Sequence, residues 1–311
     1  MEMFNKKVIE ERIGPLKKNK SLDVLRDVEI YFLKQRKKYK TDASYDVIAQ
    51  EVPSFRTLCY TEYASCFIMH PLNLQMRMRQ MIDACESDST EIVDYSSHLI
   101  NNIESKIANK YKNRLEEFEE YKDVDNLVVL AGSNKLKERV CLNKLKYISD
   151  THRNNVYFKP HPITTHAIIG ELKDLFGENR ILPREIDLYY FLNKAKKVYT
   201  THVSESAIYS IVLGKEIEPT DVYNKVHQGS FYHINSFLFQ HQADGTDGIG
   251  WINKTFSDPK SGIINPLVDI DWKNKIDVYL DYIHTERGKF ESWYIEDRPA
   301  KDDVKPLESN I

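Results

Sequence analysis

A histidine held between two prolines is the first feature of the sequence that suggests chemistry. His161 lies in KPHP, residues 159–162, directly after the apolar run VYF at 156–158, which has the composition of a buried strand. Because proline fixes the backbone, the imidazole is held in one place and can donate to a phosphate oxygen, and Lys159 adds positive charge. The ordinary alternative is a surface histidine in a turn that ends a strand.

Hydroxyl groups mark a second such position, THVSES at residues 201–206, where a predicted strand runs into a predicted helix. Ser204 and Ser206 flank that helix start, where backbone N–H groups and the helix dipole favour an anion. Both serines would also serve as helix caps without any ligand. Two further loops that follow predicted strands are polar: Gly132 with Ser133, and PRE at 183–185, which contains Glu185.

The segments that carry these loops alternate in type along the second half. Apolar runs typical of buried strands alternate with amphipathic stretches typical of helices. The predicted strands lie at 126–131, 156–159, 180–183, 197–201 and from 214 onward. This alternation predicts a doubly wound, Rossmann-like parallel sheet with helices on both faces. Such sheets bind ligands at the carboxyl ends of their strands, and all four polar loops fall at that edge.

The first half of the chain has a different composition. It is rich in charged residues and has apolar residues at helical spacing, which predicts a mostly helical region with one long helix over about 95–122. Residues 55–69 are apolar and fit either short strands or a buried helix. We therefore expect an α/β protein of two domains: 1–125, mostly helical, and 126–311, Rossmann-like with a C-terminal helical extension.

The overall composition excludes several classes of protein. The net charge of -3 over 311 residues excludes a globally basic nucleic-acid binder. No apolar run approaches the roughly 20 residues of a membrane span, and no signal peptide begins the sequence, so we expect a cytoplasmic protein. The four cysteines lack metal-ligand spacing and are interpreted as free thiols. Neither GxGxxG nor GxxxxGK[ST] occurs, which disfavours dinucleotide enzymes and NTPases.

The order of these motifs resembles one enzyme family. KPHP, followed some 40 residues later by SES, a helix and LGKE, is similar to the C-terminal half of GT-B glycosyltransferases with an HP motif, over roughly residues 126–240. That family includes bacterial sialyltransferases, polysialyltransferases and capsule Kdo transferases and, more distantly, glycerophosphate polymerases. The resemblance implies a GT-B-like fold with a reduced N-terminal acceptor half, in the cytoplasm of a bacterium or of a phage-infected host.

The resemblance also implies an activity and a donor site. A sugar would pass from a nucleotide-activated donor, linked to CMP or UDP, to a hydroxyl acceptor, with inversion and without a metal or other cofactor. His161 would contact the donor phosphate, and Ser204 and Ser206 would bind it from the helix start, with Lys159 in support. The remaining donor-site positions it implies are Gly132 and Ser133, which would face the donor, and Glu185, near the nucleobase or ribose.

The general base is where the sequence departs from the family pattern. These families carry an acidic-acidic-Gly motif in the N-terminal half, and residues 1–125 contain no such triplet. An inverting transfer needs a carboxylate or histidine within hydrogen-bond reach of the acceptor hydroxyl, for which Glu62, His70 and Asp46 are candidates. Two alternatives therefore stay open: a catalytically reduced protein that only binds a nucleotide or glycan, and a glycerophosphate-polymerase-like transferase.

A basic segment near the N-terminus suggests the kind of acceptor. Residues 1–40 carry 12 lysines and arginines against 6 acidic residues, and the densest run, 34–40, contains Lys34, Arg36, Lys37 and Lys38. Phosphate-rich molecules bind such patches. The acceptor is then either a bacterial surface glycan or a hydroxymethylated base in phage-type DNA, which requires base flipping. The alternative is a solvated helix face.

Overall fold

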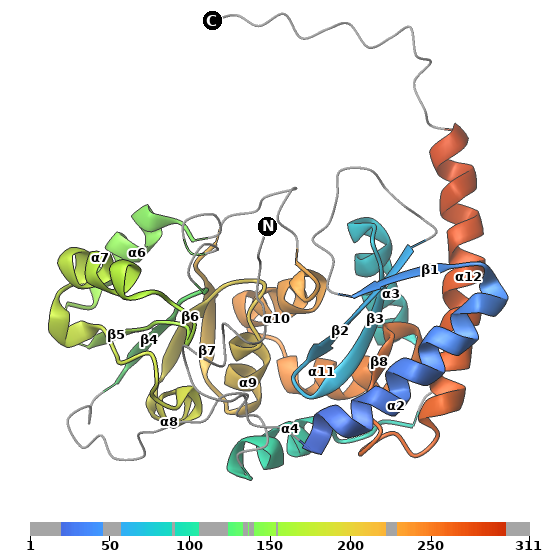
Figure 1. The fold of residues 1–311 in the computed structure, drawn as a ribbon, viewed down its shortest axis with the longest axis horizontal. Helices are drawn as coiled ribbons and strands as arrows, with labels where there is room; N and C mark the ends of the chain where they lie inside the picture. The colour runs from blue at the N-terminus through green and yellow to red at the C-terminus, as the bar shows by residue number, and fades with distance from the viewer. Residues whose placement is uncertain are drawn as a thin grey trace, which may run out of the picture.

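The structure is a computed structural model that describes residues 20–45, 57–88, 91–105, 124–132, 136, 140–153, 155–221 and 229–296. The side chains of 20–24, 44–45 and 287–296 are not part of that description. Two four-stranded sheets lie in the two halves of the molecule, with helices around and between them (Figure 1). The predicted α/β class, with a parallel sheet in the second half, is confirmed.

The sheet of the second half contains four short parallel strands in the order β5-β4-β6-β7. These are β4 (Asn126–Val129), β5 (Val156–Lys159), β6 (Lys197–Thr200) and β7 (Glu216–Pro219). The apolar runs of β4 and β5 are buried because helices cover both faces of the sheet. Four of the five predicted strands are therefore present.

Side chains that alternate along β4 reach two different cores. Val128, with Phe158 of β5, packs in a cluster with α6 (Leu142–Thr151) and α7 (His166–Phe176). Leu127 and Val129 pack in another cluster with α8 (Leu188–Lys194) and α9 (Ser206–Val212). This period of two, with a helix pair on each face, is the doubly wound arrangement that the sequence predicts.

The predicted strand at 180–183 is reduced to one bridge. Ile181 pairs in parallel with Phe158, and the N–H of Leu182 donates to the carbonyl of Phe158 at 2.9 Å. Pro183 follows at once and has no N–H to continue the ladder. The segment still brings the loop at 183–185 beside the end of β5.

The first half contains a mixed sheet as well as helices, in the order β1-β2-β3-β8. Its strands are β1 (Asp42–Tyr45), β2 (Thr57–Tyr63), β3 (Cys66–Pro71) and β8 (Ile263–Ile264). β2 and β3 form an antiparallel hairpin whose turn residues, Ala64 and Ser65, have positive φ angles of 50° and 62°, as a tight two-residue hairpin requires. The apolar stretch at 55–69 is thus a pair of strands where described.

The C-terminal part of the chain returns to the first half. β8 pairs with β3, and α12 (Trp272–Glu296) packs with α2 (Lys20–Gln35) in one cluster on this sheet (Figure 1). The sequence predicts these segments as an extension of the second domain, and the structure places them with the first. The physical reason is that β8 covers the edge of β3, which would otherwise be an open strand edge.

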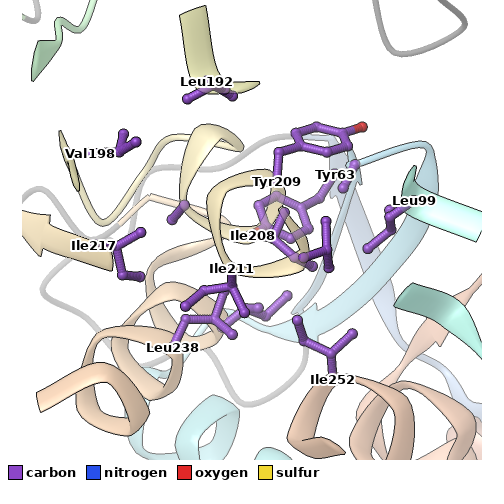
Figure 2. Close-up of a cluster of buried hydrophobic side chains, with 14 of the residues drawn as sticks. Tyr63, Leu99, Leu192, Val198, Ile208, Tyr209, Ile211, Ile217, Leu238 and Ile252 are labelled. Carbon is purple, nitrogen blue, oxygen red and sulfur yellow. The ribbon is translucent and has the colours of Figure 1, made fainter. Parts of the chain in front are cut away.

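Helices that pack against α9 form a middle layer and join the cores of the two sheets. They are α4 (Tyr95–Glu104), α10 (Tyr232–Asp244) and α11 (Gly248–Ser257). Figure 2 shows the side chains of α9 surrounded by those of the neighbouring elements, with the labelled residues Tyr63, Leu99, Leu238 and Ile252. α4 begins at Tyr95 as predicted, capped by Asp94, and the predicted continuation over 106–122 lies outside the described residues.

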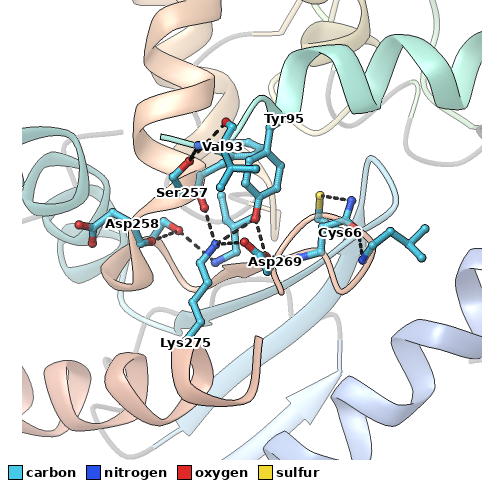
Figure 3. Close-up of polar contacts among 12 residues, drawn as sticks. Cys66, Val93, Tyr95, Ser257, Asp258, Asp269 and Lys275 are labelled. Carbon is cyan, nitrogen blue, oxygen red and sulfur yellow. Dashed lines mark hydrogen bonds and ion pairs between the residues drawn. The ribbon is translucent and has the colours of Figure 1, made fainter. Parts of the chain in front are cut away.

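A buried ion pair fastens α12 to this middle layer. Nζ of Lys275 lies 3.0 Å from Oδ1 of Asp269 and donates to the hydroxyl of Tyr95 at 2.9 Å, and that hydroxyl donates to Asp269 at 2.6 Å (Figure 3). Lys275 and Asp269 are 6–7% exposed. Each charge is therefore compensated in the interior.

None of the described helices has the length and apolarity to cross a membrane.

Candidate functional site

Strand order determines which loops meet at the carboxyl edge of the parallel sheet. The chain leaves β4 for β5 on one side and then passes to β6 on the other side of β4. The loops after these strands begin near Gly132, His161 and Thr201, so Gly132 lies between the other two. In doubly wound sheets the ligand crevice lies where the strand order reverses in this way.

Gly132 and His161 are packed against each other at this edge. A Cβ added to Gly132 would lie 3.0 Å from the side chain of Ile163 and 3.3 Å from Nδ1 of His161, so the loop after β4 approaches closely because it has no side chain there. Nδ1 of His161 accepts from the N–H of Ile163 at 3.3 Å. The neutral imidazole therefore carries its proton on Nε2, as a donor.

Lys159 lies beneath this loop. It is 3% exposed, and Nζ donates to the carbonyls of Pro160 and Arg184, each at 2.8 Å. Burial lowers the pKa of Lys159 to about 7, against the opposing effect of the Glu185 and Asp187 carboxylates. Its amino group thus joins two loops of the edge and is directed at backbone oxygens.

Arg184 is a positively charged residue at this edge that is not among the predicted site residues. Nε donates to Oε1 of Glu185 at 2.6 Å and Nη1 donates to the carbonyl of Thr164 at 2.8 Å, with its side chain 12% exposed. Burial raises the pKa of Glu185, but the hydrogen bond and charge of Arg184 outweigh it, and the net pKa is lowered. Glu185 is thus held as an anion beside the His161 loop. The sequence signal for Arg184 is its place next to Glu185 in PRE, residues 183–185.

The serines after β6 belong to a chain of three hydroxyls. Oγ of Ser206 lies 2.6 Å from Oγ1 of Thr200 and 2.7 Å from Oγ of Ser204. Ser206 is 2% exposed, whereas Ser204 is partly exposed. Because α9 has only seven residues, its dipole is a small contribution here. Ser204 is thus the accessible hydroxyl, and Ser206 supports it from the interior.

A histidine–aspartate pair, absent from the predicted site, occupies the same loop. Nδ1 of His202 lies 2.7 Å from Oδ1 of Asp221, the second residue after β7. The His202 ring stacks on Tyr232 of α10 at a centroid distance of 4.8 Å and contacts Phe239 at 4.7 Å. Nothing local predicts the pair, because its members lie 19 residues apart and meet only when β6 and β7 align.

Asn235 of α10 connects this loop to the first half. Its Nδ2 donates to the carbonyls of His202 and Ser204 at 2.8 and 2.9 Å, and its Oδ1 accepts from the hydroxyl of Tyr63 at 2.5 Å. Tyr63 ends β2. The loop after β6 therefore lies at the boundary between the two halves of the molecule.

The candidates for a general base lie in different surroundings. His70 is fully buried, its ring centroid 5.2 Å from that of His233. Burial, with the nearby Arg77 charge, lowers the pKa of His70 to about 3. An acceptor therefore has no access to His70. Glu62 lies half-buried on β2, and Asp46 and the donor-site candidate Ser133 lie outside the described residues.

The basic segment lies far from the parallel sheet. Lys34 ends α2, and Arg36, Lys37 and Lys38 belong to the 3-10 turn η1 (Arg36–Tyr39). Figure 1 places this turn beside α12, on the side of the molecule opposite the parallel sheet. The three lysines are exposed. An acceptor bound there would have to extend across the first half to reach His161.

A hollow of about 470 Å³ lies elsewhere, at the C-terminal ends of α6 and α7, where Asp150, Arg153 and Glu178 line it. Those helix ends lie at the amino edge of the parallel sheet, so this hollow is not the site described above.

No three His, Cys, Asp or Glu side chains converge as metal ligands within the described ranges.

Comparison with known proteins adds little to this description. No protein-family model and no curated protein matches the chain. A crystal structure of a candidate UDP-N-acetylglucosamine 2-epimerase from Listeria monocytogenes matches with 15% identity and a TM-score of 0.29, over 60% of this chain and 51% of that chain. The chain thus spans about half the length of that structure. A likeness this weak has no bearing on function.

Proposed function

We propose that the chain is a glycosyltransferase that moves a sugar from a nucleotide-activated donor to a hydroxyl acceptor. The observation that carries the proposal is the packing of His161 against Gly132 at the point where strand order reverses. A phosphate over the end of β4 would meet a histidine whose neutral ring carries its proton on Nε2. Ser204, one strand further on, supplies a hydroxyl.

The chemistry of this edge fits the departure of a nucleotide phosphate. As the bond between the sugar and the phosphate breaks, negative charge grows on the phosphate oxygen, and a donor already in place lowers the energy of that state. His161 would supply this donor, and Gly132 lets the backbone approach the phosphate. Lys159 and Arg184 hold the two neighbouring loops in place through backbone carbonyls.

Two alternative functions differ from this proposal, one in a residue that it needs and the other in turnover. A glycerophosphate-polymerase-like transferase usually needs a second accessible histidine of the HP type, and the other His-Pro pair, at His70, is buried. A catalytically reduced binding protein would keep the donor edge and lack turnover. Turnover is therefore the property that decides between an enzyme and a binding protein.

A donor screen tests the proposal. Thermal shift with CMP, CDP, UDP and GDP is expected to identify one nucleotide that raises the melting temperature, and the matching nucleotide sugars are then assayed for hydrolysis. Stabilisation followed by release of sugar supports a glycosyltransferase. Binding without release would favour the reduced binding protein, and no stabilisation by any nucleotide would contradict the proposal.

The proposed acceptor is a hydroxyl of a bacterial surface glycan or of a hydroxymethylated base in phage-type DNA. Transfer of a labelled sugar to capsule oligosaccharide or to hydroxymethylated DNA distinguishes these two classes. The distance of the basic segment from His161 favours an extended acceptor in either class.

A further inference from the structure

The pair formed by His202 and Asp221 has the geometry of a base held by a carboxylate. Besides the 2.7 Å contact between Nδ1 and Oδ1, the main-chain N–H of His202 donates to both carboxylate oxygens, at 3.2 and 3.1 Å. A carboxylate that receives that N–H acts as an acceptor, so Nδ1 carries the ring proton. Nε2, on the far side of the ring, keeps its lone pair.

The ring is held in one orientation and is partly accessible. Tyr232 stacks on it with an interplanar angle of 20°, and Phe239 contacts it at 57°. The side chain of His202 is 15% exposed and that of Asp221 is 8% exposed. A fixed tautomer, a fixed ring and partial exposure are the conditions under which a histidine works as a base.

The pair also lies in the right place for an acceptor. Asn235 links the His202 carbonyl to Tyr63 of the first half, so His202 lies where the two halves meet. β5 and β6 flank β4, which separates the loops of His161 and His202 by two strand spacings, about 10 Å. That separation leaves room for a sugar carbon between a phosphate at His161 and an acceptor hydroxyl at His202.

We propose that His202 is the general base of the transfer and that Asp221 is its positioning residue. The inference rests on the proposed function. Nε2 of His202 takes the proton of the acceptor hydroxyl while the hydroxyl oxygen forms a bond to the anomeric carbon. The bond from that carbon to the phosphate oxygen breaks, and its electron pair leaves with the nucleotide. The carboxylate of Asp221 stabilises the positive charge of the His202 imidazolium, which then loses its proton to water.

Substitutions at the two residues test the assignment in the full chain, with the nucleotide sugar that the unmodified protein hydrolyses, where water is the acceptor. His202→Gln is expected to slow hydrolysis by about 100-fold or more and to leave the thermal shift by the nucleotide unchanged. Asp221→Asn slows hydrolysis as well, because an amide favours the wrong tautomer. Added imidazole is expected to restore part of the rate of His202→Ala.

A matched control and the pH profile separate catalysis from folding. His241 lies on α10, as Tyr232 does. Its ring centroid is 5.5 Å from that of Trp251, and its Nδ1 is 2.7 Å from Oγ1 of Thr246. His241→Gln therefore removes a similar ring and is expected to keep full activity. The rate of the unmodified protein is expected to fall at low pH as the base becomes protonated, a limb that His202→Gln lacks.

The outcomes distinguish this inference from the function on which it depends. Undiminished hydrolysis by His202→Gln would overturn the base assignment and leave the proposed glycosyltransferase standing. Absence of both nucleotide binding and hydrolysis in the unmodified protein would overturn the two together. Loss of nucleotide binding in His202→Gln would assign His202 to donor binding and contradict its role as the base.

Discussion

Gly132 is the residue whose size most directly controls the position of His161. A methyl group at this position would lie 3.0 Å from Ile163 and 3.3 Å from Nδ1 of His161. We expect Gly132→Ala to displace the His161 loop by a few tenths of an ångström and to lower donor turnover about 10-fold, since misplaced groups lose catalytic geometry. Steady-state hydrolysis of the nucleotide sugar measures the effect.

Gly170 provides the matched control. It lies inside α7, and a Cβ there would meet nothing within 4 Å. Because alanine is a better helix former, Gly170→Ala is expected to stabilise the protein by about 0.5–1 kcal/mol and to leave turnover unchanged. Equal activity of Gly132→Ala and Gly170→Ala would contradict the account of the close approach at Gly132.

The sequence predicts some residues of this edge and not others. His161 and Ser204 follow predicted strands, so their place at one edge follows from the topology alone. Burial of Lys159 does not follow, because its bond to the Arg184 carbonyl depends on how the loop at 183–185 packs. Asp221 could not be paired with His202, since neither residue is distinctive without the alignment of β6 and β7.

At the scale of elements, Lys159 joins the loop after β5 to the loop at 183–185. Its pKa of about 7 in the folded protein is below its value of about 10.4 in the unfolded chain. Between these values the unfolded state binds more protons, so stability rises with pH over roughly pH 7 to 10. Below pH 7 both states are protonated and this contribution has no slope.

Chemical denaturation of the protein and of Lys159→Met at pH 7 and at pH 9 checks this contribution. The unmodified protein is expected to gain stability relative to the variant by on the order of 1 kcal/mol per pH unit in this window. A parallel pH dependence in the two proteins would show that Lys159 titrates normally and would contradict its buried position.

The elements themselves were predicted where burial leaves a clear pattern. β4 is an apolar run because it is covered on both faces, and the helix after KPHP begins at His166 with Thr165 as its cap. The segment at 180–183 has a strand composition but makes a single bridge, because Pro183 removes the next donor. Composition predicts how well a segment fits a sheet, and the backbone donors determine whether the ladder continues.

At the scale of the whole molecule, the buried pair of Lys275 and Asp269 holds α12 against the middle layer. Lys275→Met leaves the Asp269 carboxylate in the interior without its cation (Figure 3). Removing one partner of such a pair costs about 3–5 kcal/mol, so we expect a loss of this size in the free energy of unfolding, measured by denaturant titration.

A surface pair serves as the comparison. Lys173 lies 2.7 Å from Glu178, and these side chains are 39% and 75% exposed. Water screens such pairs, so Lys173→Met is expected to cost less than about 1 kcal/mol. Equal losses in Lys173→Met and Lys275→Met would contradict the view that the interior pair fastens α12.

The return of the chain to its first half is the feature of the whole molecule that the sequence does not predict. β8 has only two residues, too few for any periodic pattern, and it pairs with β3 across almost 200 residues of sequence. The apolar residues of α12 fit a helix on either sheet. Only the long-range packing of α12 against α2 decides between the two.

The measurement that tests the central claim most directly is donor turnover by His161→Ala. If Nε2 of His161 stabilises the leaving phosphate, kcat/KM for the nucleotide sugar is expected to fall about 100-fold or more. His152 follows the C-terminal end of α6 and so lies at the opposite, amino edge of the same sheet, and His152→Ala is expected to keep full turnover. Unchanged turnover in His161→Ala would contradict the role of this histidine and with it the proposed site.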